Sequence, residues 1–177
     1  MYFESIETDT RKSDRGEGRR VTHTRNYYLS PDKSRTEYDD NTLSLIIILD
    51  GRTRWHIFPA SNEYLEYRQE KNLASGQRFS GLDQTPGAFR VAGHEAFSGV
   101  KCIVVQIKQA HDKTQTYWIE EERHLVRKWT VDVGAESHTE AVYPVVRLGD
   151  VMKPDLFMFD PKAVNAKVRG MLSSTAP

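Results

Sequence analysis

Residues 43–58 read LSLIIILDGRTRWHIF, and this stretch decides the fold class. Two runs rich in β-branched and aromatic residues flank the pair Asp50-Gly51, which is a strong signal for a hairpin turn. A loop of two residues would mix charged side chains into the apolar face, whereas a loop of three residues ending at Gly51 keeps one face apolar. We therefore expect the following residues to share one face of a sheet: Leu43, Leu45, Ile47, Trp55 and Ile57.

The rest of the chain shows the same alternation with a period of two residues, and amphipathic helix patterns are scarce. Short strands at regular spacing favour antiparallel hairpins over units in which strand and helix alternate. Residues 72–86 are predicted to form a long connection or a short helix with loops, and Pro154 is suited to the start of a helical turn. The predicted strands are 2–10, 20–29, 34–39, 43–50, 53–58, 63–68, 88–93, 100–108, 115–120, 123–133 and 138–149.

Two of the predicted strands, 43–50 and 100–108, carry apolar residues on both faces. In the second strand, Ile103, Val105 and Ile107 point to one side of the sheet. Cys102 and Val104 point to the other side. One face can then cover a core, and we expect the other to meet a helix or loop, a ligand or a partner.

The chain has 177 residues, which is enough for one domain of ordinary size. We expect a single domain over residues 1–177, ordered to residue 170 and ending in a tail over 171–177. Lys and Arg total 25, and Asp and Glu total 25, so the zero net charge argues against a nucleic-acid partner. The longest apolar run is only Leu45–Leu49, whereas a membrane-spanning helix needs about 20 residues, so an integral membrane protein is not expected.

The first residues of the chain do not have the basic and then apolar layout of a signal peptide. On this reading the protein is either cytosolic or numbered from a point after a removed leader. The single cysteine, Cys102, excludes a disulfide within the chain. Because it lies in an apolar strand, we interpret it as a small buried hydrophobic residue.

Four features occur in order along the chain. The first is a strand, a turn and a strand over residues 27–37, which carries Arg35 and then Glu37. The second is the hairpin itself, IIILDG running into WHIFP, followed by YLEY at 64–67. The third is GHEAFSGVKC at 93–102, which leads into an apolar strand. The fourth is TYWIE at 116–120 with LVRKW at 125–129, and then PDLFMF at 154–159.

In this order the features resemble an uncharacterised branch of the outer-membrane lipoprotein-sorting (LolA/LolB-like) superfamily, over residues 27–161. The resemblance implies a mainly β fold: a strongly curved antiparallel sheet that forms a half (incomplete) β-barrel, with one or two short helices covering its concave side. Members that carry lipoproteins hold acyl chains in this apolar cavity, and other relatives are envelope stress sensors that bind partner proteins. The chain differs from the carriers because it shows no leader and no amphipathic helix before the first strand.

The resemblance predicts a non-enzymatic protein of the periplasm or cell envelope that binds an apolar ligand as a carrier or sensor. The implied partner is a lipid or the acyl chain of a lipoprotein, with an envelope protein as a further partner, and no cofactor is implied. A protein-interaction or regulatory module with a filled core is the alternative. A cupin-like metalloenzyme is the remote alternative, and zinc or iron in the purified protein would favour it.

Catalytic and metal motifs are scarce. The six histidines form neither H-x-H nor H-E-x-x-H, the spacings that place two imidazoles on one metal ion, so we predict no metal site. The chain has no G-x-S-x-G nucleophile motif, and the run Glu120-Glu121-Glu122 is typical of a charged turn between strands. We therefore predict no catalytic residue.

The three tryptophans lie on three separate predicted strands. If they converge, they form an apolar wall for an acyl chain, and ordinary core packing is the alternative. The candidate ligand-binding residues are Leu43, Leu45, Ile47, Trp55, Ile57, Trp118 and Trp129.

Overall fold

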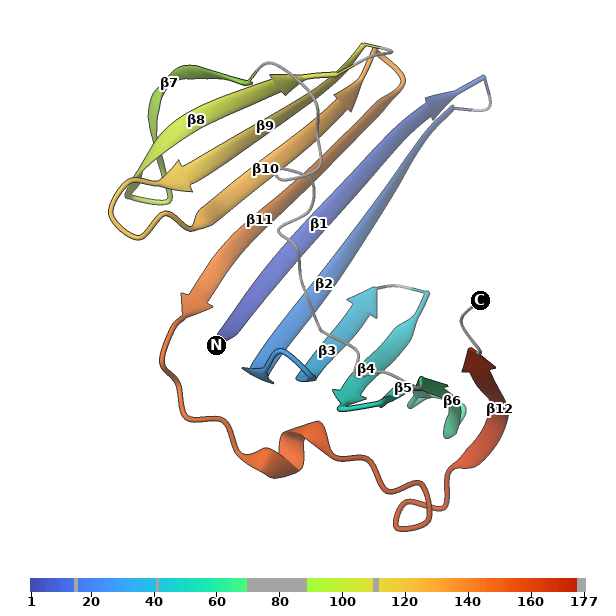
Figure 1. Ribbon diagram of the computed structural model, residues 1–177. Coiled ribbons are helices and arrows are strands. Elements are labelled where there is room, and N and C mark those ends of the chain that lie inside the picture. The colour runs from blue at the N-terminus through green and yellow to red at the C-terminus, as the bar shows by residue number, and fades with distance from the viewer. Residues whose placement is uncertain (15, 41, 70–88, 110–111, 175–177) are drawn as a thin grey trace. The chain divides into compact units, whose positions relative to one another are not determined.

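The computed structural model of the chain describes residues 1–14, 16–40, 42–69, 89–109 and 112–174. These residues form twelve strands and one short 3-10 helix (Figure 1). The elements are β1 (Tyr2–Ser13), β2 (Gly16–Ser30), β3 (Lys33–Asp40), β4 (Ser44–Asp50), β5 (Thr53–Phe58), β6 (Glu63–Gln69), β7 (Phe89–Phe97), β8 (Val100–Lys108), β9 (Lys113–Glu120), β10 (Val126–Val133), β11 (Ser137–Arg147), η1 (Pro154–Phe157) and β12 (Lys167–Ser174).

All twelve strands belong to one sheet, in the order β12-β6-β5-β4-β3-β2-β1-β11-β10-β9-β8-β7. The sheet is open in the described part of the chain, with β12 and β7 as its two edges. Neighbours from β3 to β6 and from β7 to β11 pair antiparallel, whereas β12 runs parallel to β6. The predicted mainly β fold with an open, largely antiparallel sheet is confirmed.

Eleven strands were predicted, and the structure contains a strand at each of those places and one more, β12. The tail was predicted to begin at residue 171, but residues 171–174 belong to β12 and pair with residues 66–69 of β6. A parallel edge strand is hard to detect in sequence, since its partner lies far away along the chain. The predicted connection over residues 72–86 lies outside the described residues.

The chain divides into two compact units. Unit 1 comprises residues 1–4, 24–77 and 146–177, and unit 2 comprises residues 5–23 and 78–145. Strands β1 and β2 contribute to both units. Unit 1 holds β3 to β6, η1 and β12, and unit 2 holds β7 to β10 and most of β11.

The hairpin of β4 and β5 differs from the predicted register. Its loop is Gly51 and Arg52, with Gly51 in the left-handed region at φ 62°, so Ile48 and not Leu45 lies opposite Trp55. The prediction assumed that one face of the hairpin is apolar and the other amphipathic. Both faces are covered instead, because the consecutive residues Ile48 and Leu49 are 1% and 2% exposed. The alternation of apolar and polar residues therefore could not distinguish the register of a two-residue loop from that of a three-residue loop.

The predicted helical turn at Pro154 is present as η1. Proline suits this place because its fixed φ fits the first position of a helix and its missing N–H is not needed there. Phe157 is fully buried, and η1 packs against β3 and β4 of its own unit. The guanidinium of Arg35 donates a hydrogen bond from Nη1 to the carbonyl of Leu156 at 3.4 Å. The helix is therefore fastened to the sheet of unit 1.

Candidate apolar ligand-binding faces

One face of unit 1, here called the Trp55 face, is closed by the chain itself. It carries Ile48, Trp55 and Tyr64, which the strand registers place on one side of β4, β5 and β6. The ring of Phe159 lies 5.3 Å from that of Trp55 and 5.6 Å from that of Tyr64. With Phe157 and Phe159 seated on it, the Trp55 face is a packed core.

The Arg-x-Glu pair of the first sequence feature helps to hold this cover in place. Arg35 Nε lies 2.8 Å from Glu37 Oε1, and Arg25 Nη1 lies 3.1 Å from Glu37 Oε2. Glu37 thus joins β2 to β3 and orients the guanidinium that binds the carbonyl of Leu156. In this chain the pair has a structural role in unit 1.

The opposite side of unit 1, the His56 face, carries Ile47, His56 and Leu65 in one row across β4, β5 and β6. The ring of His56 lies 4.6 Å from that of Tyr67, and its buried Nε2 has no hydrogen-bond partner among the described residues. Burial, and secondly the charge of Arg54, lower the pKa of His56 below its usual value. The imidazole is therefore favoured in its neutral form and behaves as a weakly polar part of an apolar face.

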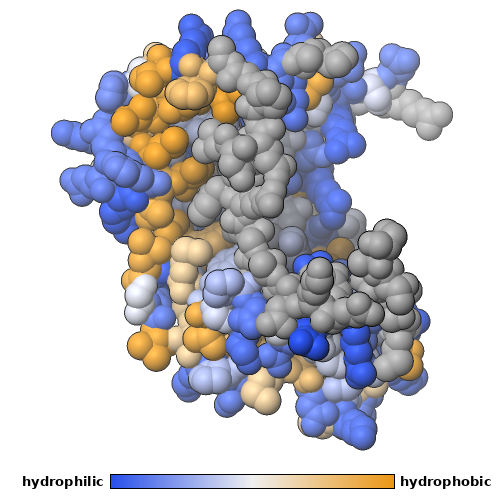
Figure 2. Space-filling model, in the orientation of Figure 1, coloured by the Kyte–Doolittle hydropathy of each residue, from blue (hydrophilic) through white to orange (hydrophobic). Residues whose placement is uncertain are grey.

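In unit 2, one row of side chains crosses five strands: Val91, Val105, Tyr117, Trp129 and Ala141. The flanking rows on the same side are largely apolar, and we call this side the Trp129 face. Figure 2 shows apolar side chains gathered over the part of the molecule formed by β7 to β10. The centre of the face is the cluster of Ile107, Tyr117 and Val126, with Ile119, Trp129 and Tyr143 packed against it.

A bulge in β10 brings Val126 to this face. Val126 lies opposite Ile119 and Lys128 lies opposite Trp118, so Arg127 is the extra residue between them. Simple alternation assigns Val126 to the side of Lys128, and that expectation is wrong because of the bulge. The expected split of β8, with Ile103, Val105 and Ile107 on one side, is confirmed.

The polar atoms of the aromatic residues on the Trp129 face are paired with one another or with neighbours. Trp129 Nε1 donates to the hydroxyl of Tyr143 at 3.0 Å, and the hydroxyl of Tyr117 donates to Gln115 Oε1 at 3.1 Å. Burial raises the pKa of both tyrosines. The face can therefore contact hydrocarbon without leaving these groups unpaired.

The Trp129 face also reaches the sheet edge at β7, where its side chains are exposed. Phe89 and Val91 on β7 lie on this side and are 75% and 61% exposed. The described residues of unit 2 form strands and turns but no helix, so no helix of its own unit covers the face. This distinguishes it from the Trp55 face of unit 1.

The other side of unit 2, the Trp118 face, combines two buried apolar residues of β8, Cys102 and Val104, with a network of charges. Trp118 Nε1 donates to Glu95 Oε2 at 2.8 Å, and Lys128 Nζ lies 4.7 Å from the centre of the Trp118 ring. Lys128 also forms an ion pair with Glu140 at 2.5 Å. Trp118 thus takes part in a network of charges, an environment that does not suit an acyl chain.

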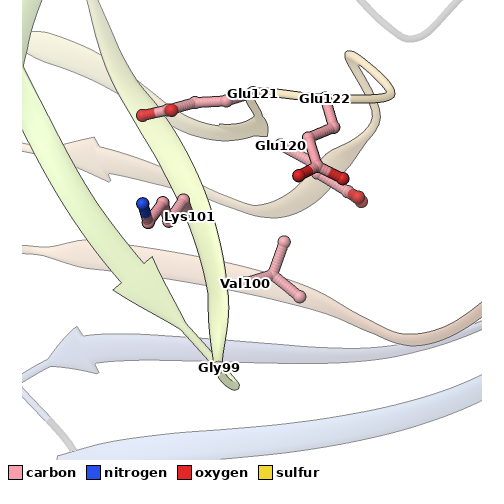
Figure 3. Close-up of a pocket in the computed structure, with 6 residues that line it drawn as sticks. All are labelled: Gly99, Val100, Lys101, Glu120, Glu121 and Glu122. Atoms are coloured by element: carbon pink, nitrogen blue, oxygen red, sulfur yellow. The ribbon is translucent and has the colours of Figure 1, made fainter.

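A pocket of about 430 Å³ lies at the end of this sheet region, between the β7–β8 turn and the end of β9 (Figure 3). Arg123 binds both carboxylate oxygens of Glu120, at 2.7 and 3.0 Å, and His94 Nδ1 lies 2.8 Å from Glu121 Oε1. The predicted charged turn is confirmed, since residues 121–123 form a turn between two strands. The lining residues are Gly99, Val100, Lys101, Glu120, Glu121 and Glu122. A lining this acidic is unsuited to lipid.

The structure separates the seven candidate residues. Leu45 and Ile47 lie on the His56 face, whereas Trp55 and Ile57 lie on the Trp55 face. The prediction that these residues share one face is therefore wrong. Leu43 precedes β4 and is 38% exposed.

The two remaining tryptophans also lie on opposite sides of their sheet. Trp129 lies opposite Tyr117 and shares its side, whereas Trp118 lies opposite Lys128. Tyr117 and Trp118 are consecutive in β9, so their side chains point to opposite sides. Of the seven, Trp129 alone belongs to the Trp129 face. Tyr117 and Tyr143, two further members of this face, were not predicted from the sequence. The apolar residues of strand 100–108 pointed to it, but nothing in the sequence singled out Tyr143.

Two further observations limit the chemistry of the described residues. They contain no group of three or more His, Cys, Asp or Glu side chains placed to hold a metal ion. The one helix among them is too short to cross a membrane.

Comparisons by sequence find no match, either to a protein-family model or to a curated protein. Solved structures do match. An uncharacterized conserved protein from Thermus thermophilus aligns over 94% of this chain and 90% of its own, at 10% identity and a TM-score of 0.60. LprF from Mycobacterium bovis aligns over 84% of this chain and 88% of its own, at 10% identity and a TM-score of 0.50.

A chain of the MucA/MucB complex of Pseudomonas aeruginosa aligns over 90% of this chain, at 12% identity and a TM-score of 0.53. This chain spans only 56% of that chain's length. At such low identities these likenesses concern the fold alone. They show that the fold of this chain also occurs in these solved structures.

Proposed function

We propose that the protein binds an apolar ligand, a lipid or the acyl chain of a lipoprotein, on the Trp129 face of unit 2. It does so without catalysis, as a carrier or sensor in the bacterial cell envelope. The observation that carries this proposal is the row from Val91 to Ala141, which is apolar across five strands and which no helix among the described residues of unit 2 covers.

The energetics of this face suit hydrocarbon. Each buried methylene contributes about 0.8 kcal/mol, so a chain of about 14 carbons supplies on the order of 10 kcal/mol before the costs of binding. No charged handle is needed for such a ligand. The hydroxyl and indole groups of Tyr117, Trp129 and Tyr143 on this face already take part in hydrogen bonds within the protein, so they do not need water as a partner.

Native mass spectrometry of the purified protein, together with lipid extraction, tests the proposal. We expect lipid to copurify with the wild-type chain. Val105→Asp places a charge in the middle of the Trp129 face and should remove the lipid. Gln106→Asp is the matched control, since Gln106 is the next residue of β8, is also half-buried, and lies on the opposite face. A chain that purifies without lipid, and whose Trp129 face is filled by side chains in an experimental structure, would overturn the proposal.

A protein-interaction module with a filled core is the alternative function. The edge strand β7 is the observation in its favour, because most of its residues are exposed and an edge strand offers unpaired backbone groups to another chain. Such a module would capture a specific envelope protein in a pull-down and would bind no acyl-chain probe.

A further inference from the structure

Strand β7 is the free edge of the sheet in unit 2 (Figure 1). Seven of its nine residues are exposed, among them Phe89 and Val91. Its outer backbone N–H and C=O groups meet no other strand of the described part of the chain. A free edge of this length is a template for pairing with a further strand, and proteins that remain monomeric usually protect it.

A bulge divides β7 into two halves. Val91 lies opposite Val105, whereas Gly93 lies opposite Val104. Ala92 is therefore an extra residue without a counterpart in β8. The bulge also reverses the alternation of side chains: before it, the odd-numbered residues of β7 lie on the Trp129 face, and after it, the even-numbered residues do. A partner strand without a bulge would leave Ala92 unmatched, as β8 does.

A second copy of the chain carries the same bulge and can therefore match β7 residue for residue. We consider two β7 strands that run antiparallel and are related by a two-fold axis at the bulge, the symmetry of most protein dimers. Because both strands reverse their alternation there, every pair outside the bulge joins two residues of the same face. The matched pairs are Phe89 with Ala96, Arg90 with Glu95, Val91 with His94 and Ala92 with Gly93.

The charges in this register are complementary, because the two-fold axis brings Arg90 and Glu95 together twice. Both residues keep atoms available for the contact. Arg90 uses Nε and Nη2 to bind Gln106 Oε1, at 3.2 and 2.8 Å, which leaves Nη1. Glu95 accepts from Trp118 Nε1 through Oε2, which leaves Oε1. Neither residue forms an ion pair with a described residue, and opposite charges that face each other across strands stabilise the pairing.

We propose that the protein forms a symmetric dimer through β7, in which the sheets of unit 2 from two copies join edge to edge in this register. The pairing satisfies the outer backbone groups of β7 and covers part of Phe89 and Val91. One strand from each copy is a small contact, so the dimer should be weak, with a Kd in the micromolar range. The inference concerns the sheet edge, goes beyond the proposed ligand binding and does not depend on it.

Sedimentation velocity of the full chain, from micromolar to submillimolar concentration, tests the proposal. We expect the wild-type chain to pass from monomer to dimer over this range. Glu95→Arg and Arg90→Glu each place like charges opposite one another, so each should weaken dimerisation at least about tenfold. The double variant with both changes restores the opposite charges in exchanged order, and it should dimerise within about threefold of the wild type.

Glu136→Arg is the matched control. It makes the same change of charge as Glu95→Arg, at an exposed residue of the turn between β10 and β11. It should leave the Kd within about twofold of the wild-type value, since exposed charges far from the contact are screened by salt. An effect of Glu136→Arg as large as that of Glu95→Arg would overturn the proposal.

Two further results would also overturn it. A wild-type chain that stays monomeric throughout the range would leave the edge of β7 to a different protein. A double variant that dimerises no better than the two single variants would show that the contact does not follow this register. The ligand proposal has a separate readout, because Arg90 and Glu95 lie on the Trp118 face. Their variants should keep the lipid that copurifies with the wild-type chain, so each proposal can fail while the other stands.

Discussion

The Trp55 face of unit 1 and the Trp129 face of unit 2 are both built from apolar side chains on neighbouring antiparallel strands. In unit 1, the segment that follows β11 returns to the sheet: Phe159 packs on Trp55 and Tyr64, and Phe157 is buried in η1, which packs on β3 and β4. In unit 2, no described helix covers the Trp129 face, and the edge residues Phe89 and Val91 remain largely exposed.

This difference shows how an apolar sheet face that contributes to stability can be told from one that is a candidate for binding. An apolar sheet face that the chain covers with its own aromatic side chains contributes stability, because its surface is already removed from water. On the Trp129 face, the polar atoms of Trp129 and Tyr117 are paired internally and the edge residues Phe89 and Val91 are exposed, which supports the proposed binding role. The same kind of strand can therefore serve either purpose, and the covering segment decides which.

Removal of the covering side chain should have the largest effect on stability. Phe157→Ala deletes a fully buried ring from the Trp55 face, and we expect it to lower the free energy of unfolding by about 3–5 kcal/mol. Urea denaturation measures this loss. The matched control is Met158→Ala, one residue away and 62% exposed, which should change stability by less than about 0.5 kcal/mol. Equal effects at the two positions would show that the Trp55 face is not sealed by this segment.

A smaller effect is expected on the Trp129 face. Tyr143→Phe removes the acceptor of the Trp129 indole N–H and should destabilise the protein by about 1–2 kcal/mol, because a half-buried donor loses its partner. Thermal unfolding followed by tryptophan fluorescence measures it. Tyr67→Phe is the control: no hydrogen bond of the Tyr67 hydroxyl to a described residue is present, so its loss should be nearly neutral. A neutral Tyr143→Phe would mean that the indole N–H does not need this partner.

The smallest effect concerns pH and the His56 face. Burial lowers the pKa of His56, so the unfolded chain binds a proton more readily than the folded chain does. Stability is then fully present above the usual histidine pKa of about 6.5 and falls as the pH drops below it. His56→Leu should flatten this decline in urea denaturation between neutral and mildly acidic pH. The same decline in the variant and the wild type would assign it to other groups.

Sequence reasoning predicted the fold class because period-2 alternation and turn residues are local signals. Pro154 correctly marked a helical turn for the same reason. The predicted hairpin register is wrong because Ile48 and Leu49, which are adjacent in sequence, are both buried. Neither face of the strand is marked by exposed polar residues at this point, so the sequence does not show which face points to solvent. The candidate residues of the hairpin do not share one face because their grouping depended on the predicted register, and that register is wrong.

Two other features depended on distant partners. The bulge that turns Val126 onto the Trp129 face is visible only once β10 is paired with β9. The parallel pairing of β12 with β6 joins segments about a hundred residues apart, for which the sequence contains no local signal. Tyr143 likewise became part of the face only through its contact with Trp129.

Titration with a fluorescent acyl-chain probe tests the central claim most directly. We predict that the wild-type chain binds the probe, that Gln106→Asp binds it within about twofold of the wild type, and that Val105→Asp weakens binding at least about tenfold. Val91→Asp, at a position 61% exposed on the same face, should also weaken binding without a cost to folding. Equal affinity for all four proteins, or a wild-type chain that does not bind the probe, would contradict the account.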